Sequence, residues 1–247
     1  TERAGADLEG LIERQLKNAD RALGNRMQDG ARPDGPEAYD MALLNVQSRF
    51  EIPRMVQALQ ARGHGTLCFY GPPGTGKTAL AEHIASTLAQ PLNVRRASDL
   101  MSKYVGETEQ NMAAMFREAE AENAILLLDE ADSFLQDRRG AQRNHEVSEV
   151  NEMLQGMERF HGIFICTTNL MDRIDQAALR RFTFKIQFQA LTRAQRLNLF
   201  VAEVFAGDAT RVAQGMAKRL ANLDHLCVGD FAAVKRLGVA VCACFLL

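Results

Sequence analysis

Gly71-Pro72-Pro73-Gly74-Thr75-Gly76-Lys77-Thr78 is the stretch of sequence that decides the fold. It follows a short apolar run at residues 66–70 and opens a segment in which Leu80, Ile84 and Leu88 recur at helical spacing. A strand, a glycine-rich loop and a helix in this order are the context of a phosphate-binding P-loop. Glycines let the backbone wrap closely around an anion, with its N–H groups and the positive end of the helix directed at one point.

The last two residues of this loop carry its chemistry. Lys77 can reach the outer phosphates of a nucleotide as a point charge, and the Thr78 hydroxyl can bind Mg²⁺. A simple glycine turn between a strand and a helix would require neither Lys-Thr at the helix start nor the full GxxxxGK[ST] spacing. The sequence therefore predicts a site for phosphate and Mg²⁺.

Composition limits the possible partners and compartments. The 247 residues are 47% hydrophobic and 24% charged, with a formal net charge of −2, which is typical of a soluble globular protein. This near-neutral balance gives no overall electrostatic case for nucleic acid as a partner and leaves open a local basic groove. No apolar run reaches the roughly 18 residues that span a bilayer, so we expect no membrane insertion. The five cysteines lack paired metal-ligand spacing and are expected to be free thiols in a reducing cytoplasm.

Patterning along the chain divides it into three regions. Residues 1–37 contain an amphipathic helix followed by a Gly/Pro-rich linker. Residues 38–190 alternate strands with helices, which predicts a doubly wound α/β domain with a parallel five-stranded sheet. Residues 191–247 lack strand signals and are expected to form a small all-helical lid. The strands are expected at residues 66–70, 92–94, 124–128, 162–166 and 184–188.

Polar residues stand at the ends of two of these strands. Asp129 and Glu130 directly follow a buried aliphatic run, where Asp129 can hold a water of the Mg²⁺ shell and Glu130 can polarise an attacking water. Asn169 follows the next strand, where its amide can hydrogen-bond a phosphate and the attacking water. Ligands of such sheets bind at the carboxyl ends of the strands, so these side chains are expected beside the P-loop.

Two adjacent arginines, Arg180 and Arg181, precede the last strand. Phosphoryl transfer builds charge on the equatorial oxygens, and a guanidinium placed there raises the rate by ~10³ or more. Their position in the chain predicts that they cannot fold back onto their own P-loop, so they would serve the site of a neighbouring subunit.

With these residues in place, the chain from about Leu43 onward resembles the AAA+ ATPases. GPPGTGKT is similar to the family's Walker A motif, residues 125–132 (ILLLDEAD) to Walker B, residues 167–169 (TTN) to sensor 1, and residues 178–182 (ALRRF) to the arginine-finger segment. The resemblance implies ATP hydrolysis with Mg²⁺. It implies as catalytic residues Glu130, Asn169, Arg180 and Arg181, and as metal ligands Thr78 and Asp129. The implied nucleotide-binding positions are Gly71, Pro72, Pro73, Gly74, Thr75, Gly76, Lys77, Thr78, Ala79, Asp129 and, at the start of the lid helix, Gly229.

Residues 102–107 (SKYVGE) resemble the pore loop of the protein-remodelling branch of this family. In a hexameric ring such loops line the central channel, so Lys103, Tyr104 and Val105 would grip an extended polypeptide while Gly106 lets the loop move. The implied partners are further copies of this chain and a protein that is unfolded, threaded or dismantled. An ordinary packing role for Tyr104 remains open.

The resemblance departs from the family pattern at three places and leaves two alternative functions. Arg180 and Arg181 are adjacent, where many relatives separate the two arginines by Pro-Gly. Residues 45–49 stand where many relatives carry an Asp/Gly motif beside adenine, and a second sensor arginine is absent unless Arg236 serves. One alternative is an ATP-dependent assembly switch or scaffold that threads nothing. The other is a DNA-handling loader or helper, which the neutral charge and the aromatic pore loop disfavour.

Overall fold

The computed structural model describes residues 40–104, 106–135, 144–170, 174–205, 207–212 and 214–236. The predicted N-terminal helix and linker (residues 1–37) and Val105 lie outside these ranges, as does the side chain of Arg236.

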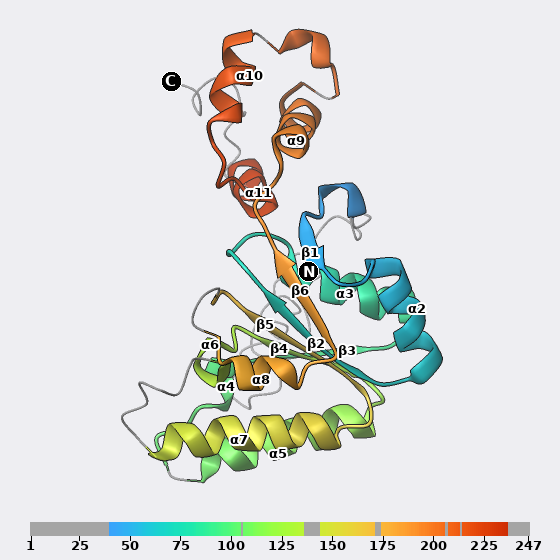
Figure 1. The fold of residues 1–247 in the computed structure, drawn as a ribbon, viewed down its shortest axis with the longest axis vertical. Coiled ribbons are helices and arrows are strands. Elements are labelled where there is room, and N and C mark those ends of the chain that lie inside the picture. Colours follow the sequence, from blue (N-terminus) through green and yellow to red (C-terminus); the bar gives the residue numbers. More distant parts are fainter. Residues whose placement is uncertain are drawn as a thin grey trace, which may run out of the picture. The chain divides into compact units, whose positions relative to one another are not determined.

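A six-stranded sheet in the order β1-β6-β2-β5-β4-β3 forms the centre of the described part (Figure 1). All neighbours are parallel except β1, which pairs antiparallel with β6. The predicted parallel five-stranded sheet is confirmed, with one more strand at its edge. The strands are β1 (Val46–Ser48), β2 (Gly65–Tyr70), β3 (Leu92–Arg96), β4 (Ile125–Asp129), β5 (Ile163–Thr168) and β6 (Phe184–Phe188).

The extra strand β1 corrects the expectation of five strands. It has only three residues and no run of apolar side chains, so its sequence carries no strand signal. Tertiary contacts hold it instead: the Gln189 N–H donates to Asn45 O at 2.9 Å, and Asn45 Nδ2 donates to Ala190 O at 2.5 Å.

Helices cover both faces of the sheet. In Figure 1, α2 and α3 lie on one face, and α5, α7 and α8 lie on the other. A four-residue helix, α4, stands between β3 and the loop at residues 101–106, where the sequence indicated no helix. The helices of the α/β part are α2 (Ile52–Arg62), α3 (Lys77–Leu88), α4 (Ala97–Leu100), α5 (Glu107–Ala121), α6 (Asp132–Leu135), α7 (Asn144–Arg159) and α8 (Gln176–Arg180).

The main core lies between the sheet and the pair α5 and α7. The Phe116 ring of α5 lies 5.7 Å from the Phe160 ring and 5.5 Å from the Phe164 ring, measured between centroids. A Cβ on Gly156 would come within 2.4 Å of the Phe116 ring, so a glycine in the middle of α7 lets the two helices approach. Burying a phenylalanine side chain contributes about 1.5–3 kcal/mol, which outweighs the roughly 1 kcal/mol cost of glycine in a helix.

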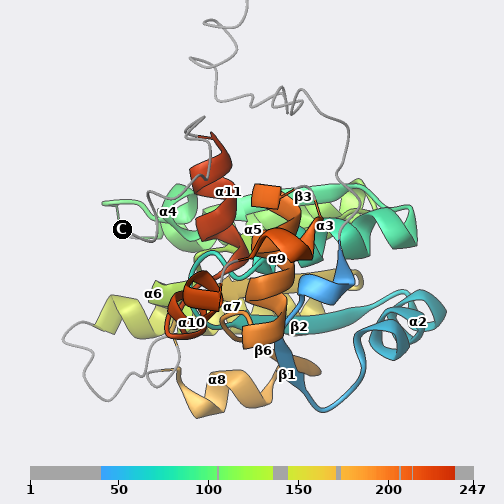
Figure 2. The same ribbon diagram turned by 90° about the horizontal axis from the view of Figure 1, so that it is seen from above.

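The chain after β6 is helical in the part that the structure describes. It contains α9 (Arg193–Phe205), a 3₁₀ turn, η3 (Ala209–Arg211), α10 (Gln214–Ala221) and α11 (Val228–Arg236). Helix α11 begins at Val228, and the Asp230 carboxylate accepts the Cys227 N–H at 2.7 Å and fixes its first turn. The three α-helices gather beyond the end of β6 in Figure 1, and Figure 2 looks down onto them.

Helix lengths and cysteine states can be compared with the expectations from composition. Over the described ranges, every helix is too short or too polar to span a bilayer. Cys68, Cys166 and Cys227 are free and buried, and burial raises the pKa of the Cys68 thiol to about 12.

Candidate nucleotide-binding site

The loop between β2 and α3 adopts a conformation that depends on its glycines. Gly71, Gly74 and Gly76 all have positive φ, at +142°, +73° and +92°. A Cβ on Gly71 would lie 2.2 Å from the carbonyl oxygen of Phe188, so only glycine fits there. The Thr75 hydroxyl donates to Pro72 O at 2.8 Å and closes the loop from within. This backbone fits the phosphate cradle expected of a P-loop.

Lys77, the first residue of α3, is buried inside this loop. Its ammonium donates to Gly71 O and Pro72 O, both at 2.8 Å, and to Asn169 Oδ1 at 2.9 Å. The P-loop of β2 and the polar residue after β5 are thereby in direct contact, as the rule for parallel strand ends predicts.

The charge on Lys77 is held in a partly desolvated place. Burial lowers the pKa of Lys77 below its ordinary value, while the carboxylates of Asp129 and Asp132 oppose that shift. A cation that has already lost much of its water is well suited to bind an anion, because it has less hydration to give up.

Asp129, at the end of β4, has its two carboxylate oxygens directed at different partners. The Thr78 hydroxyl donates to Oδ2 at 3.2 Å, and the Thr167 hydroxyl donates to Oδ1. A carboxylate and a hydroxyl, both oxygen donors side by side, suit the preference of Mg²⁺ for oxygen ligands. The residues present therefore fit a magnesium nucleotide.

Glu130 follows in a strained backbone conformation. Its φ of +56° lies in the left-handed region, which is costly for a residue with a side chain. The turn is held by Thr167, whose hydroxyl accepts the Glu130 N–H at 3.1 Å and whose carbonyl accepts the Ala131 N–H at 2.8 Å. The Glu130 side chain is exposed, which leaves its carboxylate open to solvent at the end of β4.

From the sequence, Asp132 was expected to stabilise its loop rather than touch substrate, and Thr167 had no role beyond its place in the TTN motif. Thr167 holds Asp129 and Glu130, while Asp132 Oδ1 accepts the Thr168 hydroxyl at 2.5 Å and the Asn169 N–H at 2.9 Å. These contacts follow from the parallel pairing of β4 with β5, which places the residues after the two strands side by side, and the sequence alone did not assign that pairing.

Arg180 and Arg181 lie away from this group of residues. Arg181 O accepts the hydroxyl of Thr66, at the start of β2, at 3.5 Å, whereas the P-loop begins after the end of β2. The five steps along the chain from Thr66 to Gly71 cover about 16 Å in a strand. Arg180 is exposed, and the guanidinium of Arg181 pairs with Glu158 at 3.4 Å. The two arginines are at the edge of the sheet opposite the P-loop.

Gly229, near the start of α11, touches the P-loop directly. Its N–H donates to Gly74 O at 2.8 Å, and a Cβ on Gly229 would lie 2.8 Å from the Gly74 Cα. The C-terminal helical region thus contacts the loop at the position that the sequence assigned to nucleotide binding.

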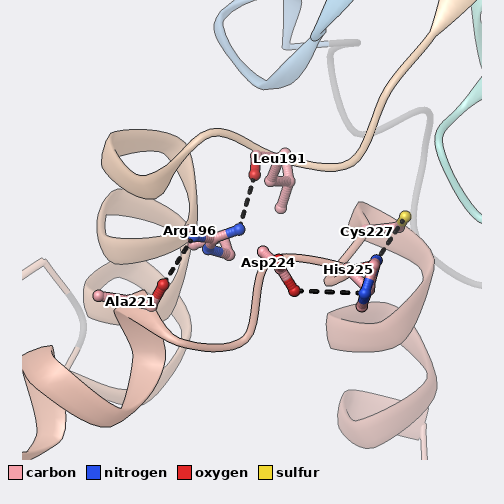
Figure 3. Close-up of polar contacts among 6 residues, drawn as sticks. All are labelled: Leu191, Arg196, Ala221, Asp224, His225 and Cys227. Atoms are coloured by element: carbon pink, nitrogen blue, oxygen red, sulfur yellow. Dashed lines mark hydrogen bonds and ion pairs between the residues drawn. The ribbon is translucent and has the colours of Figure 1, made fainter.

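A buried arginine, Arg196, hydrogen-bonds two backbone carbonyls in this helical region (Figure 3). Arg196, which is 5% exposed, donates to Leu191 O at 3.1 Å and to Ala221 O at 3.2 Å. The Leu191 N–H donates in turn to Leu226 O at 3.0 Å, next to the start of α11. Arg196 therefore ties the segment after β6 to the end of α10.

The loop at residues 101–106 presents Tyr104 to solvent. The Tyr104 side chain is 72% exposed, and Lys103 beside it is also exposed. The loop is closed at its base, where the Ser102 hydroxyl donates to the Glu107 carboxylate at 2.5 Å and accepts the Tyr104 N–H at 3.2 Å. An exposed aromatic on a closed loop argues against an ordinary packing role for Tyr104.

Comparison with known proteins identifies the family. Residues 67–190 match the family described as "ATPase family associated with various cellular activities (AAA)". The chain belongs to the AAA family. This confirms the predicted family and its mixed α/β fold, and membership implies that the AAA domain binds a nucleotide.

The chain is similar to proteins of three different kinds. The AAA chain is 33% identical to the vesicular-fusion protein SEC18 of Saccharomyces cerevisiae over 171 residues, which are 62% of this chain and 23% of SEC18. It is 31% identical to the ATP-dependent zinc metalloprotease FtsH of Lachnoclostridium phytofermentans over 197 residues, 74% of this chain and 34% of FtsH. It is 32% identical to spastin of Drosophila mojavensis over 182 residues, 69% of this chain and 23% of spastin. The chain thus spans about a third or less of these relatives.

Proposed function

We propose that this chain hydrolyses ATP as a subunit of a homo-oligomeric ring, and that the ring, a hexamer, remodels a protein substrate in the cytoplasm. The observation that carries the proposal is the convergence of Lys77, Asn169, Thr78 and Asp129 through direct contacts at one edge of the sheet. Family membership and the similarity to an ATP-dependent zinc metalloprotease support the same chemistry.

The P-loop and Lys77 bind the phosphates. The loop N–H groups and the start of α3 attract the anion, and Lys77 exchanges its contacts with Gly71 O and Pro72 O for phosphate oxygens. Thr78 and Asp129 would hold Mg²⁺, which supplies charge neutralisation at the phosphates. Gly229 brings the start of α11 against Gly74, so the helical region closes the nucleotide site from the C-terminal side.

Glu130 and Asn169 act on the attacking water. The exposed Glu130 carboxylate, directly after the end of β4, polarises a water as general base. The Asn169 amide, already in contact with Lys77, orients the water and the outermost phosphate. Each role requires the side chain to come within about 3 Å of the water. Glu130 and Asn169 can meet the same water because they follow two strands that are adjacent in the sheet.

The protein-remodelling role rests on the loop that carries Tyr104. An exposed aromatic and an exposed lysine on a loop between α4 and α5 can contact an extended polypeptide by stacking and by charge. Movement of this loop would depend on whether ATP or ADP is bound. A nucleotide can shift the chain from one conformation to another only if it binds the second conformation more tightly.

The chemistry is tested by ATP hydrolysis and by equilibrium nucleotide binding in parallel. Lys77→Ala is expected to lose both, because the phosphate loses its cation. Glu130→Gln is expected to bind ATP but to lose at least 100-fold in kcat, on the order of what a general base contributes. Tight ATP binding by Lys77→Ala, or normal turnover by Glu130→Gln, would contradict the assigned roles.

Threading is tested separately with Tyr104→Ala. A threading ring is expected to lose remodelling of an unfolded model protein while its ATP hydrolysis stays near normal. The matched control is Met101→Ala, an exposed apolar residue at the other end of the same loop. Unchanged remodelling by Tyr104→Ala would favour the assembly switch or scaffold instead.

A further inference from the structure

We propose that Asp132 is a positioning residue, whose carboxylate holds the backbone after β5 so that the Asn169 amide faces Lys77. This inference rests on the proposed ATP hydrolysis, because Asn169 is assigned to the attacking water. It concerns a residue that follows the proposed Mg²⁺ ligand and general base by a few positions but serves neither role.

Asp132 connects the ends of two strands. It opens the short helix α6 after β4, and its Oδ1 accepts both the Thr168 hydroxyl at 2.5 Å and the Asn169 N–H at 2.9 Å. Thr168 is fully buried, and its hydroxyl also accepts the Leu170 N–H at 3.1 Å. One carboxylate oxygen therefore organises three successive residues, Thr168, Asn169 and Leu170.

Asn169 needs such a restraint because the sheet does not supply one. The pairing of β5 with β2 ends at Thr168, and its pairing with β4 ends at Cys166. Asn169 is thus one residue beyond the last strand pair, where its N–H is bonded to Asp132 rather than to a neighbouring strand. Losing that carboxylate would leave the buried Thr168 hydroxyl without its acceptor and the Asn169 backbone without an anchor.

The effect on geometry reaches the nucleotide site through the contact between Asn169 and Lys77. Asn169 Oδ1 accepts the Lys77 ammonium at 2.9 Å, so the direction of the amide depends on the backbone that Asp132 holds. The Asp132 charge also raises the pKa of Lys77 against the effect of burial. Geometry and charge can be separated, because asparagine at position 132 keeps an oxygen acceptor and removes the charge.

The experiment compares kcat and KM for ATP in Asp132→Ala, Asp132→Asn, Asn169→Ala and the double variant Asp132→Ala/Asn169→Ala. Asp132→Ala is expected to lower kcat about tenfold or more, as expected of a misplaced catalytic group, with little change in KM. Asp132→Asn should retain most of kcat. The double variant should be no slower than Asn169→Ala, because Asp132 acts through Asn169. Ser133→Ala, an exposed neighbour in α6, is the matched control.

A normal kcat in Asp132→Ala, with only a lower Tm, would overturn the inference, and so would a further independent loss in the double variant. A crystal structure of Asp132→Ala decides the point without any turnover. Displacement of the Asn169 amide from Lys77 would support the inference, and an unchanged contact would overturn it. If the unmodified chain hydrolyses no ATP, the proposed function fails while the structural comparison still tests the positioning role.

Discussion

At the scale of single residues, the most informative feature of the site is the backbone of Glu130. A side chain in the left-handed region costs about 1–2 kcal/mol, and the fold tolerates this because Thr167 binds the backbone on both sides of the turn. Such strain often marks a functional position, since the surrounding structure must hold it in place. The exposed Glu130 side chain directly follows β4, which suits a base that must meet a water.

In an ordinary helix alanine gives a more stable protein than glycine, and at position 130 we expect the opposite order. We expect Glu130→Gly to be more stable than Glu130→Ala by about 1 kcal/mol, because glycine adopts a positive φ without strain. At Glu82, an exposed residue within α3, alanine should instead exceed glycine by about 1 kcal/mol. Urea unfolding of the four variants measures both differences, and both variants at position 130 should fail to hydrolyse ATP. Equal or greater stability of Glu130→Ala would show that no strain is stored there.

At the scale of elements, the C-terminal helices depend on a polar connection as well as on apolar packing. The last carbonyls of a helix lack partners within the helix, and Arg196 of α9 donates to Ala221 O, the last of α10. Its second bond, to Leu191 O, anchors the segment that leaves β6. Both bonds are made by a charged donor with little access to water, so each should contribute more than an exposed bond would.

Arg196→Met should lower the free energy of unfolding by about 2 kcal/mol, because two backbone carbonyls lose a charged donor while the aliphatic part of the side chain is kept. Arg193→Met is the control in the same helix, where an exposed arginine should contribute within about 0.5 kcal/mol. Chemical unfolding followed by circular dichroism gives both values. If the two substitutions have the same effect, Arg196 does not hold these helices together.

The elements that the sequence predicted are those with a strong local signal. The run at residues 124–128 and the P-loop both specify their structure within a dozen residues, so β4 and α3 were expected where they occur. The strand β1 and the helix α4 have three and four residues, too few for periodicity to appear. Their positions come from pairing and packing with distant segments, which a single sequence does not display.

Some contacts of the candidate site were likewise predictable from the sequence, and others were not. The gathering of the P-loop, Asp129 and Asn169 follows from the polarity of parallel strands and was predictable. The contacts of Thr167 and Asp132 join residues more than thirty positions apart, at ends of β4 and β5 whose adjacency in the sheet was not assigned. Whether either arginine touches a phosphate depends on a neighbouring subunit, so that role remains a proposal.

At the scale of the whole molecule, the sheet separates the parts of one proposed reaction. The phosphate-binding groups lie at the carboxyl edge of the strands, while Arg180 and Arg181 precede β6 at the opposite edge. The span of β2 exceeds the reach of an arginine side chain, so a chain cannot complete its own site with these residues. A repeated head-to-tail contact between copies would bring one edge against the other, and such contacts form a ring when the rotation between neighbours closes.

Mixing two inactive variants should therefore restore hydrolysis. Glu130→Gln lacks the base but keeps both arginines, and Arg180→Ala/Arg181→Ala lacks the arginines but keeps the base. In randomly mixed rings at equal amounts, half of the subunits keep Glu130 and half of those have an arginine-bearing neighbour, which gives about a quarter of the wild-type rate. A mixture of Glu130→Gln with Lys77→Ala is the control, because its two defects lie in the same half of the site and no combination repairs either. Steady-state hydrolysis, measured as total protein concentration rises, distinguishes the outcomes: recovery only in the first mixture places the arginines in trans, whereas full activity of the double arginine variant alone would remove the reason for a ring.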